Sequence, residues 1–259
     1  MLNWANQFSI FCLLDNHQYQ IEPHTVECML AAGSKRSIIA GNGNSLNDLQ
    51  HFIDKKKSWL FGHLNYDLKN EIELLTSSHT DHLGFPELFF FEPEYLVRLR
   101  GGTIVIDASD PQKVYDDILI SMPDHPGYVA DITEIHSRIS KHDYIETVQR
   151  LQQHILRGDC YEINFCQEFF SDNVQIDPLF VYEQLSVVSP NPFSALYKLN
   201  DKYLICASPE RFIKKEGAHL LSQPIKGTAK RNSNHRNEDA FHKEKLYHSQ
   251  KKVSLILFH

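Results

Sequence analysis

The residue whose position most strongly suggests chemistry is Lys226, in the stretch QPIKGTAKR (223–231). It stands between an apolar Pro-Ile pair and a Gly-Thr pair at which the backbone can turn tightly. An amine in an apolar pocket loses its proton more readily, because desolvation disfavours the ammonium form, and a neutral amine is a nucleophile. A single lysine is more often a solvated surface residue, so this interpretation depends on what the rest of the chain supplies.

Two further segments carry residues suited to chemistry. GDCYEINFCQEF (158–169) contains Asn164, and CASPERF (206–212) places Glu210 directly after a proline. Each segment alone has a structural explanation. The Gly-Asp pair is typical of a helix end, and a Pro-Glu-Arg sequence is typical of an ordinary turn.

The three segments together resemble the chorismate-utilising enzymes, specifically component I of aminodeoxychorismate synthase and the related anthranilate synthase. GDCYEINFCQEF is similar to the family's Gly-Asp-x-Tyr-x-x-Asn strand, SPERF to its Ser-Pro-Glu-Arg-Phe segment, and PIKGT to its Pro-Ile-Lys/Ala-Gly-Thr loop. GHLNYDLKNEIE (62–73) is similar to a Gly-x-x-x-Tyr-Asp-Leu-Lys stretch of short members. The resemblance extends from residue 58 to residue 250.

The resemblance implies amination of chorismate to 4-amino-4-deoxychorismate, for para-aminobenzoate and folate synthesis. In this family lysine at the position of Lys226 is typical of the aminodeoxychorismate branch, and alanine of the anthranilate and salicylate branches. The implied catalytic roles are nucleophile at ring carbon C2 for Lys226 and general acid at the C4 hydroxyl for Glu210. Gly227, Thr228 and Asn164 are expected to bind substrate. We expect Glu210 to share one cleft with Lys226, in surroundings that raise the pKa of its carboxyl.

The family pattern gives way, near residue 250, to the sequence KVSLILFH. The resemblance therefore leads us to expect a truncated or frameshifted chain in which the C-terminal part of the fold is missing. In the family that part supplies the glutamates that bind Mg²⁺, so we expect the cofactor to be Mg²⁺ but no metal site in this chain. On this expectation the chain is inactive as it stands. The implied partners are chorismate and a glutamine amidotransferase subunit that supplies ammonia.

Alternative functions stay open. One is anthranilate synthase component I, against which Lys226 argues, and another is a non-catalytic remnant of the chorismate family. A nucleic-acid patch at 226–236 conflicts with the net charge of −7 and with the lack of interleaved aromatic residues. No apolar run approaches the ~20 residues of a membrane helix, and the N-terminus lacks the basic start of a secretory signal. We therefore expect a cytoplasmic protein that binds neither nucleic acid nor membranes.

The elements that position these residues indicate an α+β fold, with antiparallel β-sheets packed with helices, of the anthranilate synthase component I-like, chorismate-binding type. Apolar residues at helical spacing predict a helix over 144–157 that ends at Gly158, and alternation then predicts a strand to residue 169 carrying Asn164. Gly-Gly at 101–102 and Asn-Asp at 200–201 predict hairpins. Helices are expected after Asp110 and over PLFVYEQLSVV (178–188).

The chain of 259 residues, 42% of them apolar, is long enough for one large domain or two small ones. We divide it into the N-terminal part of the fold (1–122), a connector (123–140), an incomplete chorismate-binding region (141–250) and an aberrant tail (251–259). The five cysteines form no CxxC pair and are expected to be free, mostly buried thiols.

Overall fold

The computed structural model describes residues 1–19, 26–41, 43–73, 75–122, 134–223, 229–232 and 235–248. The described elements are, in chain order, α1 (Leu2–Asn6), β1 (Ile10–Asp15), β2 (Cys28–Ala32), β3 (Arg36–Ala40), α2 (Ser45–Lys55), β4 (Phe61–Leu64), the 3₁₀ turn η1 (Tyr66–Leu68), α3 (Lys69–Ile72), β5 (Leu88–Glu92), β6 (Tyr95–Arg100), β7 (Thr103–Asp107), α4 (Pro111–Ile120), β8 (His136–Ser137), α5 (Lys141–Arg157), β9 (Phe169–Phe170), α6 (Pro178–Val188), β10 (Phe193–Leu199), β11 (Lys202–Ser208), β12 (Arg211–Glu216), β13 (His219–Gln223) and α7 (Arg236–Tyr247). Every pair of neighbouring strands is antiparallel, which confirms the predicted fold class.

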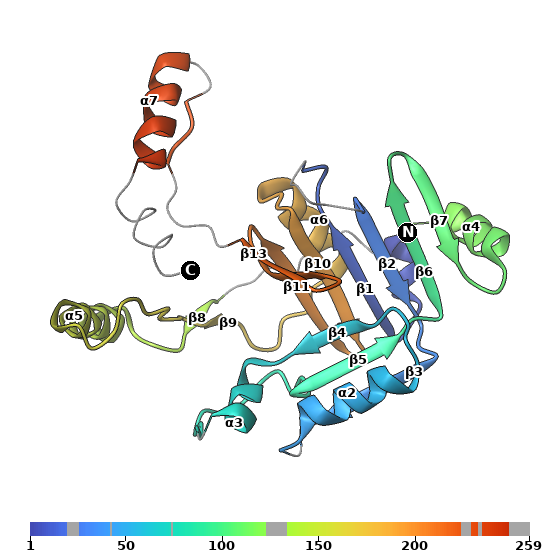
Figure 1. Cartoon of the computed structure of the whole chain (residues 1–259), viewed down its shortest axis with the longest axis horizontal. Helices are drawn as coiled ribbons and strands as arrows, with labels where there is room; N and C mark the ends of the chain where they lie inside the picture. Colours follow the sequence, from blue (N-terminus) through green and yellow to red (C-terminus); the bar gives the residue numbers. More distant parts are fainter. Residues whose placement is uncertain are drawn as a thin grey trace.

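The centre of the molecule is a six-stranded sheet in the order β11-β10-β1-β2-β6-β7 (Figure 1). Inside this sheet β1 pairs with β10, with Ile10 opposite Leu199 and Asp15 opposite Ser194. Strands from both sides of the predicted connector thus share one sheet, although the connector's residues 123–133 lie outside the described part.

Alternation along the central strands gives the sheet two apolar faces. Phe11 and Leu13 of β1 pack with Trp4, Val114 and Leu179 from the helices α1, α4 and α6. On the opposite face, a second cluster includes Cys12 and Ala31 of the large sheet and Phe61, Phe89 and Phe91 of the three-stranded sheet β3-β5-β4. Helices α1, α4 and α6 therefore cover one face of the sheet, and the small second sheet packs on the other.

The two hairpins and the helix after Asp110, which were predicted from local sequence, are present in the structure. Gly101 and Gly102 have φ values of 54° and 72° and join β6 to β7, as the mirror-image turn of a two-residue hairpin requires. Asn200, with φ 57°, turns β10 into β11. The side chain of Asp110 accepts a hydrogen bond from Lys113 N at 3.1 Å and starts α4.

The helix predicted before Gly158 is confirmed. It is α5, which begins after Ser140, whose hydroxyl accepts a hydrogen bond from Asp143 N at 3.1 Å. It ends at Gly158, which adopts the left-handed conformation with φ 83°.

The strand predicted after α5 is wrong except for its last residue. Only Phe169 and Phe170 form a strand, β9, which pairs with the equally short β8. The pairing of β8 with β9 does not extend further, because the side chain of Gln167, and not its backbone, bonds to the backbone of Ile139. Its amide oxygen accepts from Ile139 N at 3.2 Å, and its amide nitrogen donates to Ile139 O at 2.6 Å. Residues 160–166 alternate in type, but no strand in the described part of the chain pairs with them.

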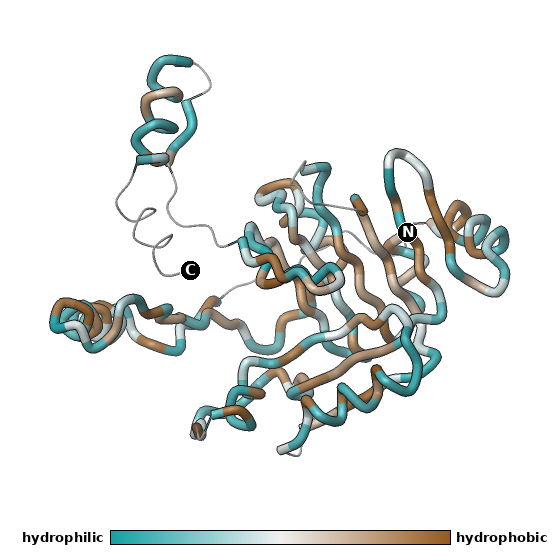
Figure 2. Tube along the Cα trace, in the orientation of Figure 1, coloured by the Kyte–Doolittle hydropathy of each residue, from teal (hydrophilic) through white to brown (hydrophobic). Residues whose placement is uncertain are grey.

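The β8-α5-β9 segment extends away from the two packed sheets, and α7 lies apart from them as well (Figure 1). Figure 2 shows apolar residues concentrated along the central strands and a further apolar group on α5. All five cysteines are free as predicted, but most are not buried: Cys12 is buried, whereas Cys166 is exposed. Among the described helices none has the length and apolar character needed to cross a membrane.

Candidate active site

Glu210 lies at the turn between β11 and β12. The hydroxyl of Ser208 accepts a hydrogen bond from Glu210 N at 3.2 Å and donates one to Glu210 O at 3.0 Å, which closes the turn around Pro209. The Glu210 side chain is exposed. The described residues therefore fix the backbone of Glu210 but do not supply the enclosure that a proton-donating carboxyl needs.

Arg211 continues from this turn into the β12–β13 hairpin. It stands opposite Gln223, and its guanidinium donates to the Gln223 side-chain oxygen at 3.1 Å. The same guanidinium lies 5.0 Å from the centre of the Phe193 ring. Glu210 and Gln223 are consequently neighbours at the open end of the hairpin. The predicted residues Lys226, Gly227 and Thr228 follow Gln223 and lie outside the described residues.

A hollow of about 540 Å³ opens beside β12. The described residues that line it come from separate parts of the chain, and they include Leu14, Asp15, Trp59, Phe193, Arg211 and Lys214. Glu210 is not among these described lining residues. Sequence reasoning missed this hollow because only the pairing of distant strands brings its walls together.

Asn164 occupies different surroundings from Glu210. It is exposed, lies in the extended segment after α5, and lines a second hollow of about 600 Å³ together with Val148, Leu151 and Ile155 of that helix. The structure therefore does not place Glu210 and Asn164 in the same described hollow. The common cleft for Glu210 and Lys226 stays a prediction.

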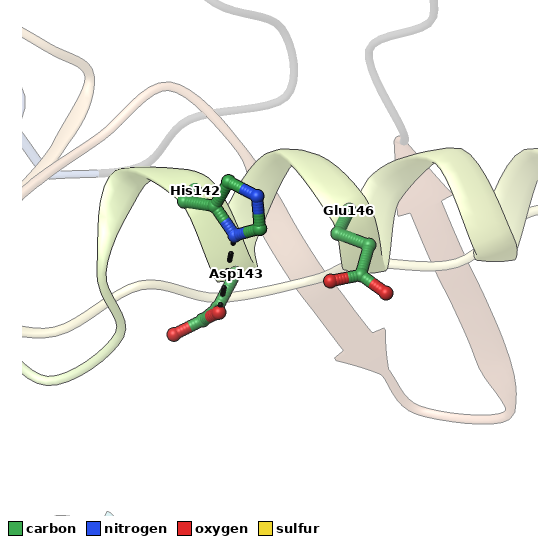
Figure 3. Close-up of side chains that lie close together, drawn as sticks. All are labelled: His142, Asp143 and Glu146. Atoms are coloured by element: carbon green, nitrogen blue, oxygen red, sulfur yellow. Dashed lines mark hydrogen bonds and ion pairs between the residues drawn. The ribbon is translucent and has the colours of Figure 1, made fainter.

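One group of three side chains with metal-binding atoms occurs in the described part of the chain: His142, Asp143 and Glu146, at the start of α5 (Figure 3). Their potential ligand atoms lie within 4.8 Å of one another, and all three residues are exposed. Asp143 already accepts a hydrogen bond from the Ser140 hydroxyl at 2.7 Å. That bond, followed by the one from His142, lowers the pKa of the Asp143 carboxyl.

This group does not fit Mg²⁺, which prefers oxygen ligands in octahedral geometry. It offers one imidazole and two carboxylates, one of which is engaged at the helix start. Its geometry is that of a capped helix terminus, and no chemical step through a metal is derived from it.

Comparison with known proteins places this geometry in context. The family model described as chorismate binding enzyme matches residues 11–254. Anthranilate synthase component 1 of Thermus thermophilus is 28% identical over 205 residues, which cover 74% of this chain and 44% of the relative. Aminodeoxychorismate synthase component 1 of Salmonella typhimurium is 36% identical over 95 residues, covering 37% of this chain and 21% of the relative. The matches thus span less than half the length of these two relatives.

Two solved structures share the fold. Anthranilate synthase component I from Streptococcus pneumoniae superimposes with a TM-score of 0.71 at 18% identity, covering 92% of this chain and 61% of its own. The menaquinone-specific isochorismate synthase from Escherichia coli gives a TM-score of 0.67 at 13% identity, covering 99% and 58%. At these identities the similarity concerns the fold.

Proposed function

The chain belongs to the family of chorismate-binding enzymes, and we propose that its reaction is that of aminodeoxychorismate synthase component I, the amination of chorismate to 4-amino-4-deoxychorismate. The observation that carries this proposal is Lys226 within PIKGT (224–228). By resemblance, lysine at this position distinguishes the aminodeoxychorismate branch from branches that carry alanine. The curated relatives include proteins named for each of the two reactions, so the proposed choice between them rests on this residue.

The β12–β13 hairpin supports a joint role for Lys226 and Glu210. Pairing of Arg211 with Gln223 places Glu210 beside the point where the chain leaves towards residue 226. Three residues span at most about 11 Å. This length allows an amine at 226 and a carboxyl at 210 to reach one small ring, as the proposed nucleophile and general acid must.

In the proposed first step the Lys226 amine attacks ring carbon C2 of chorismate. As the C2–N bond forms, the ring double bonds shift and the C4–O bond breaks. Glu210 supplies the proton with which the hydroxyl leaves as water, because hydroxide is a poor leaving group. Gly227, Thr228 and Asn164 are proposed to bind the substrate.

In the second step ammonia attacks C4, the double bonds shift back, and the C2–N bond breaks to release the lysine amine. The proton lost by the incoming nitrogen restores Glu210. We propose that a glutamine amidotransferase subunit supplies the ammonia. The word component in the names of the relatives is consistent with such an assembly. Mg²⁺ belongs to the proposal through the resemblance alone, and no step is assigned to it.

The second candidate function is anthranilate synthesis. It is favoured by the Thermus thermophilus relative, whose match covers 74% of this chain. That reaction places nitrogen at C2 of the ring rather than at C4. The two functions are therefore distinguished by their products, which chromatography separates.

The proposal predicts a covalent adduct at Lys226. Incubated with chorismate in the absence of ammonia, the protein should gain the mass of chorismate minus one water, and peptide mass spectrometry should locate the gain at Lys226. Ammonium should then discharge the adduct as 4-amino-4-deoxychorismate. Lys226→Ala should abolish the adduct, whereas Lys230→Ala, a nearby exposed lysine, should leave it unchanged. An adduct that survives in Lys226→Ala, or anthranilate as the product, would contradict the proposal.

A further inference from the structure

The six-stranded sheet ends at β7, which pairs only with β6 within the described residues (Figure 1). Four of its five residues are exposed, and Ile104 and Val105 keep 46% and 42% of their surfaces open to solvent. An edge strand of this kind offers N–H and C=O groups to another strand, and natural proteins usually protect it with lysine, proline or a bulge. The stretch TIVID (103–107) has no lysine and no proline, and it pairs with β6 without a register shift. The outer edge of β7 is therefore suited to pairing with a further strand.

The backbone of Ile104 and Ile106 points away from β6. Leu99 O accepts a hydrogen bond from Glu27 N at 2.9 Å, so the backbone of Leu99 faces the β2 side and not β7. Leu99 stands opposite Ile104, and Val97 stands opposite Ile106. Because hydrogen-bonded and non-hydrogen-bonded pairs alternate along an antiparallel ladder, both of these pairs are of the non-hydrogen-bonded kind. The N–H and C=O groups of Ile104 and Ile106 are consequently directed at the open edge.

The side chains of β7 alternate between the two faces of the sheet. Ile106 packs against the cluster that includes Val114 of α4, and Ile104 shares that face because it lies two residues away. The other three residues of β7 lie on the opposite face. There Arg98 Nη2 donates to Asp107 Oδ2 at 2.6 Å, so the one charged residue of β7 already has a counterion within its own chain. The strand thus presents no uncompensated charge to a partner.

A second copy of β7 fits this edge in a full-length antiparallel register, with a two-fold axis at Val105. Ile104 of each copy then lies opposite Ile106 of the other as a hydrogen-bonded pair, which uses all the outward-directed groups of both strands. On the other face Val105 meets Val105 of the second copy, and the Thr103 hydroxyl meets the Asp107 carboxylate. Apolar residues therefore face apolar residues, and a donor faces an acceptor, as favourable cross-strand pairs require.

Charge complementarity supports the same register. Arg100 is exposed and stands opposite Thr103 on β6. In the paired sheet Asp107 of the second copy lies on the other side of Thr103, about 10 Å from Arg100 between backbones, which is two strand spacings. An extended arginine side chain spans most of that distance, so each copy supplies a cation to the carboxylate of the other. Such an isologous contact uses the β7 edge of both copies, and association through it stops at a dimer.

We propose that β7 is a dimerisation edge that joins two copies of this chain by antiparallel pairing about Val105. The proposal concerns assembly and does not depend on which reaction the protein catalyses. Because Val105 lies on the axis, a charge placed there meets the identical charge of the second copy and weakens association. Opposite charges at this position in two different variants attract each other instead.

The test measures the mass of the full chain by light scattering over a dilution series. The parent should be a dimer, and Val105→Lys and Val105→Glu should each raise its dissociation constant at least about tenfold. Mixing the two variants, with an affinity tag on the lysine variant alone, should restore the dimer and retain the untagged glutamate variant. Val188→Lys and Val188→Glu, at a residue 82% exposed at the end of α6, should leave the parent dimer unchanged. Thermal unfolding of each variant shows whether it is folded.

Val105→Cys provides a second measurement that introduces no charge. In a non-hydrogen-bonded pair the two Cα atoms lie about 4.5 Å apart, within the range of a disulfide. Oxidation with diamide should therefore cross-link Val105→Cys into a covalent dimer, beyond any that the five cysteines of the parent form, whereas Ile104→Cys should not cross-link.

A parent chain that stays monomeric throughout the dilution series would overturn the proposal. So would a dimer that neither charged variant weakens, because its contact would lie elsewhere on the molecule. Dissociation of both charged variants without recovery on mixing, or cross-linking of Ile104→Cys as readily as Val105→Cys, would contradict pairing about Val105.

Discussion

Glu92 is a carboxylate held by two cations in the interior of the molecule. Its oxygens lie 2.6 Å from Lys56 Nζ and 2.6 Å from Arg36 Nε, and only 8% of its side chain is exposed. Hydrogen bonds from Lys56, and then from Arg36, lower the pKa of Glu92 to about 2. Arg36 also donates to Phe52 O at 2.9 Å, so the cluster links strands β3 and β5 to helix α2.

Replacing Glu92 by Gln should lower the free energy of unfolding near neutral pH by about 1–3 kcal/mol, because the partly buried Arg36 loses its charged acceptor. The folded pKa is below the ordinary value of 4.5. The stabilisation is therefore complete above that value and is lost as the pH falls towards 2. Urea titrations should show parent and variant converging over this range, while Glu94→Gln, two residues away and exposed, stays close to the parent. A pH-independent difference would contradict this reading.

The site residues show what a motif can and cannot predict. Glu210 and Asn164 were identified through sequence segments that resemble those of known enzymes. A motif specifies residue types along the chain, whereas exposure depends on elements that are distant in sequence. The enclosure expected for Glu210 is accordingly not provided by the residues described around it.

Strands β4 and β5 approach each other closely at Gly62. Gly62 stands opposite Phe90. A Cβ atom at Gly62 would lie 1.9 Å from Phe89 O and 2.7 Å from Phe90 Cα. Both obstacles are backbone atoms, so rotation of a side chain cannot relieve them. Only glycine fits this position without displacing a strand of the small sheet.

Gly62→Ala should therefore lower the free energy of unfolding by at least about 1–3 kcal/mol, the usual range for overpacking. Chemical denaturation monitored by tryptophan fluorescence would measure the change. Gly41→Ala is the matched control, since its added Cβ would be 3.5 Å from a Glu87 side-chain oxygen, an ordinary contact. If both variants unfolded at the same denaturant concentration, the close approach at Gly62 would not be a source of strain.

Elements defined by local chemistry were predictable, and those defined by distant pairing were not. The end of α5 follows from Gly158 and the β6–β7 turn from two glycines, since each conformation is set by residues within a few positions. The prediction of a strand over 160–168 was wrong, because alternating residue types are compatible with a strand but do not ensure that another strand lies beside it. For the same reason the sequence does not reveal that β10 pairs with β1.

At the scale of the whole molecule, burial is concentrated in the two clusters on either side of the six-stranded sheet. Helices α5 and α6 provide an internal comparison. Both have a side-chain cap, Ser140 in α5 and Asp177 in α6. Leu179 and Tyr182 of α6 are buried in the core, whereas within the described structure α5 buries none of its residues. The two capped helices therefore differ in how far their residues are buried in the core.

This difference predicts separate opening of the two helices in the isolated chain. Because most helical stability in proteins comes from packing of the apolar face, α5 should open in a local event well below the global free energy of unfolding. α6 should open only with the sheet that it covers. Native-state hydrogen exchange should give amides in the middle of α5 protection factors at least about tenfold lower than those in the middle of α6. Equal protection would show that α5 is held by contacts as extensive as those of the core, and would contradict this prediction.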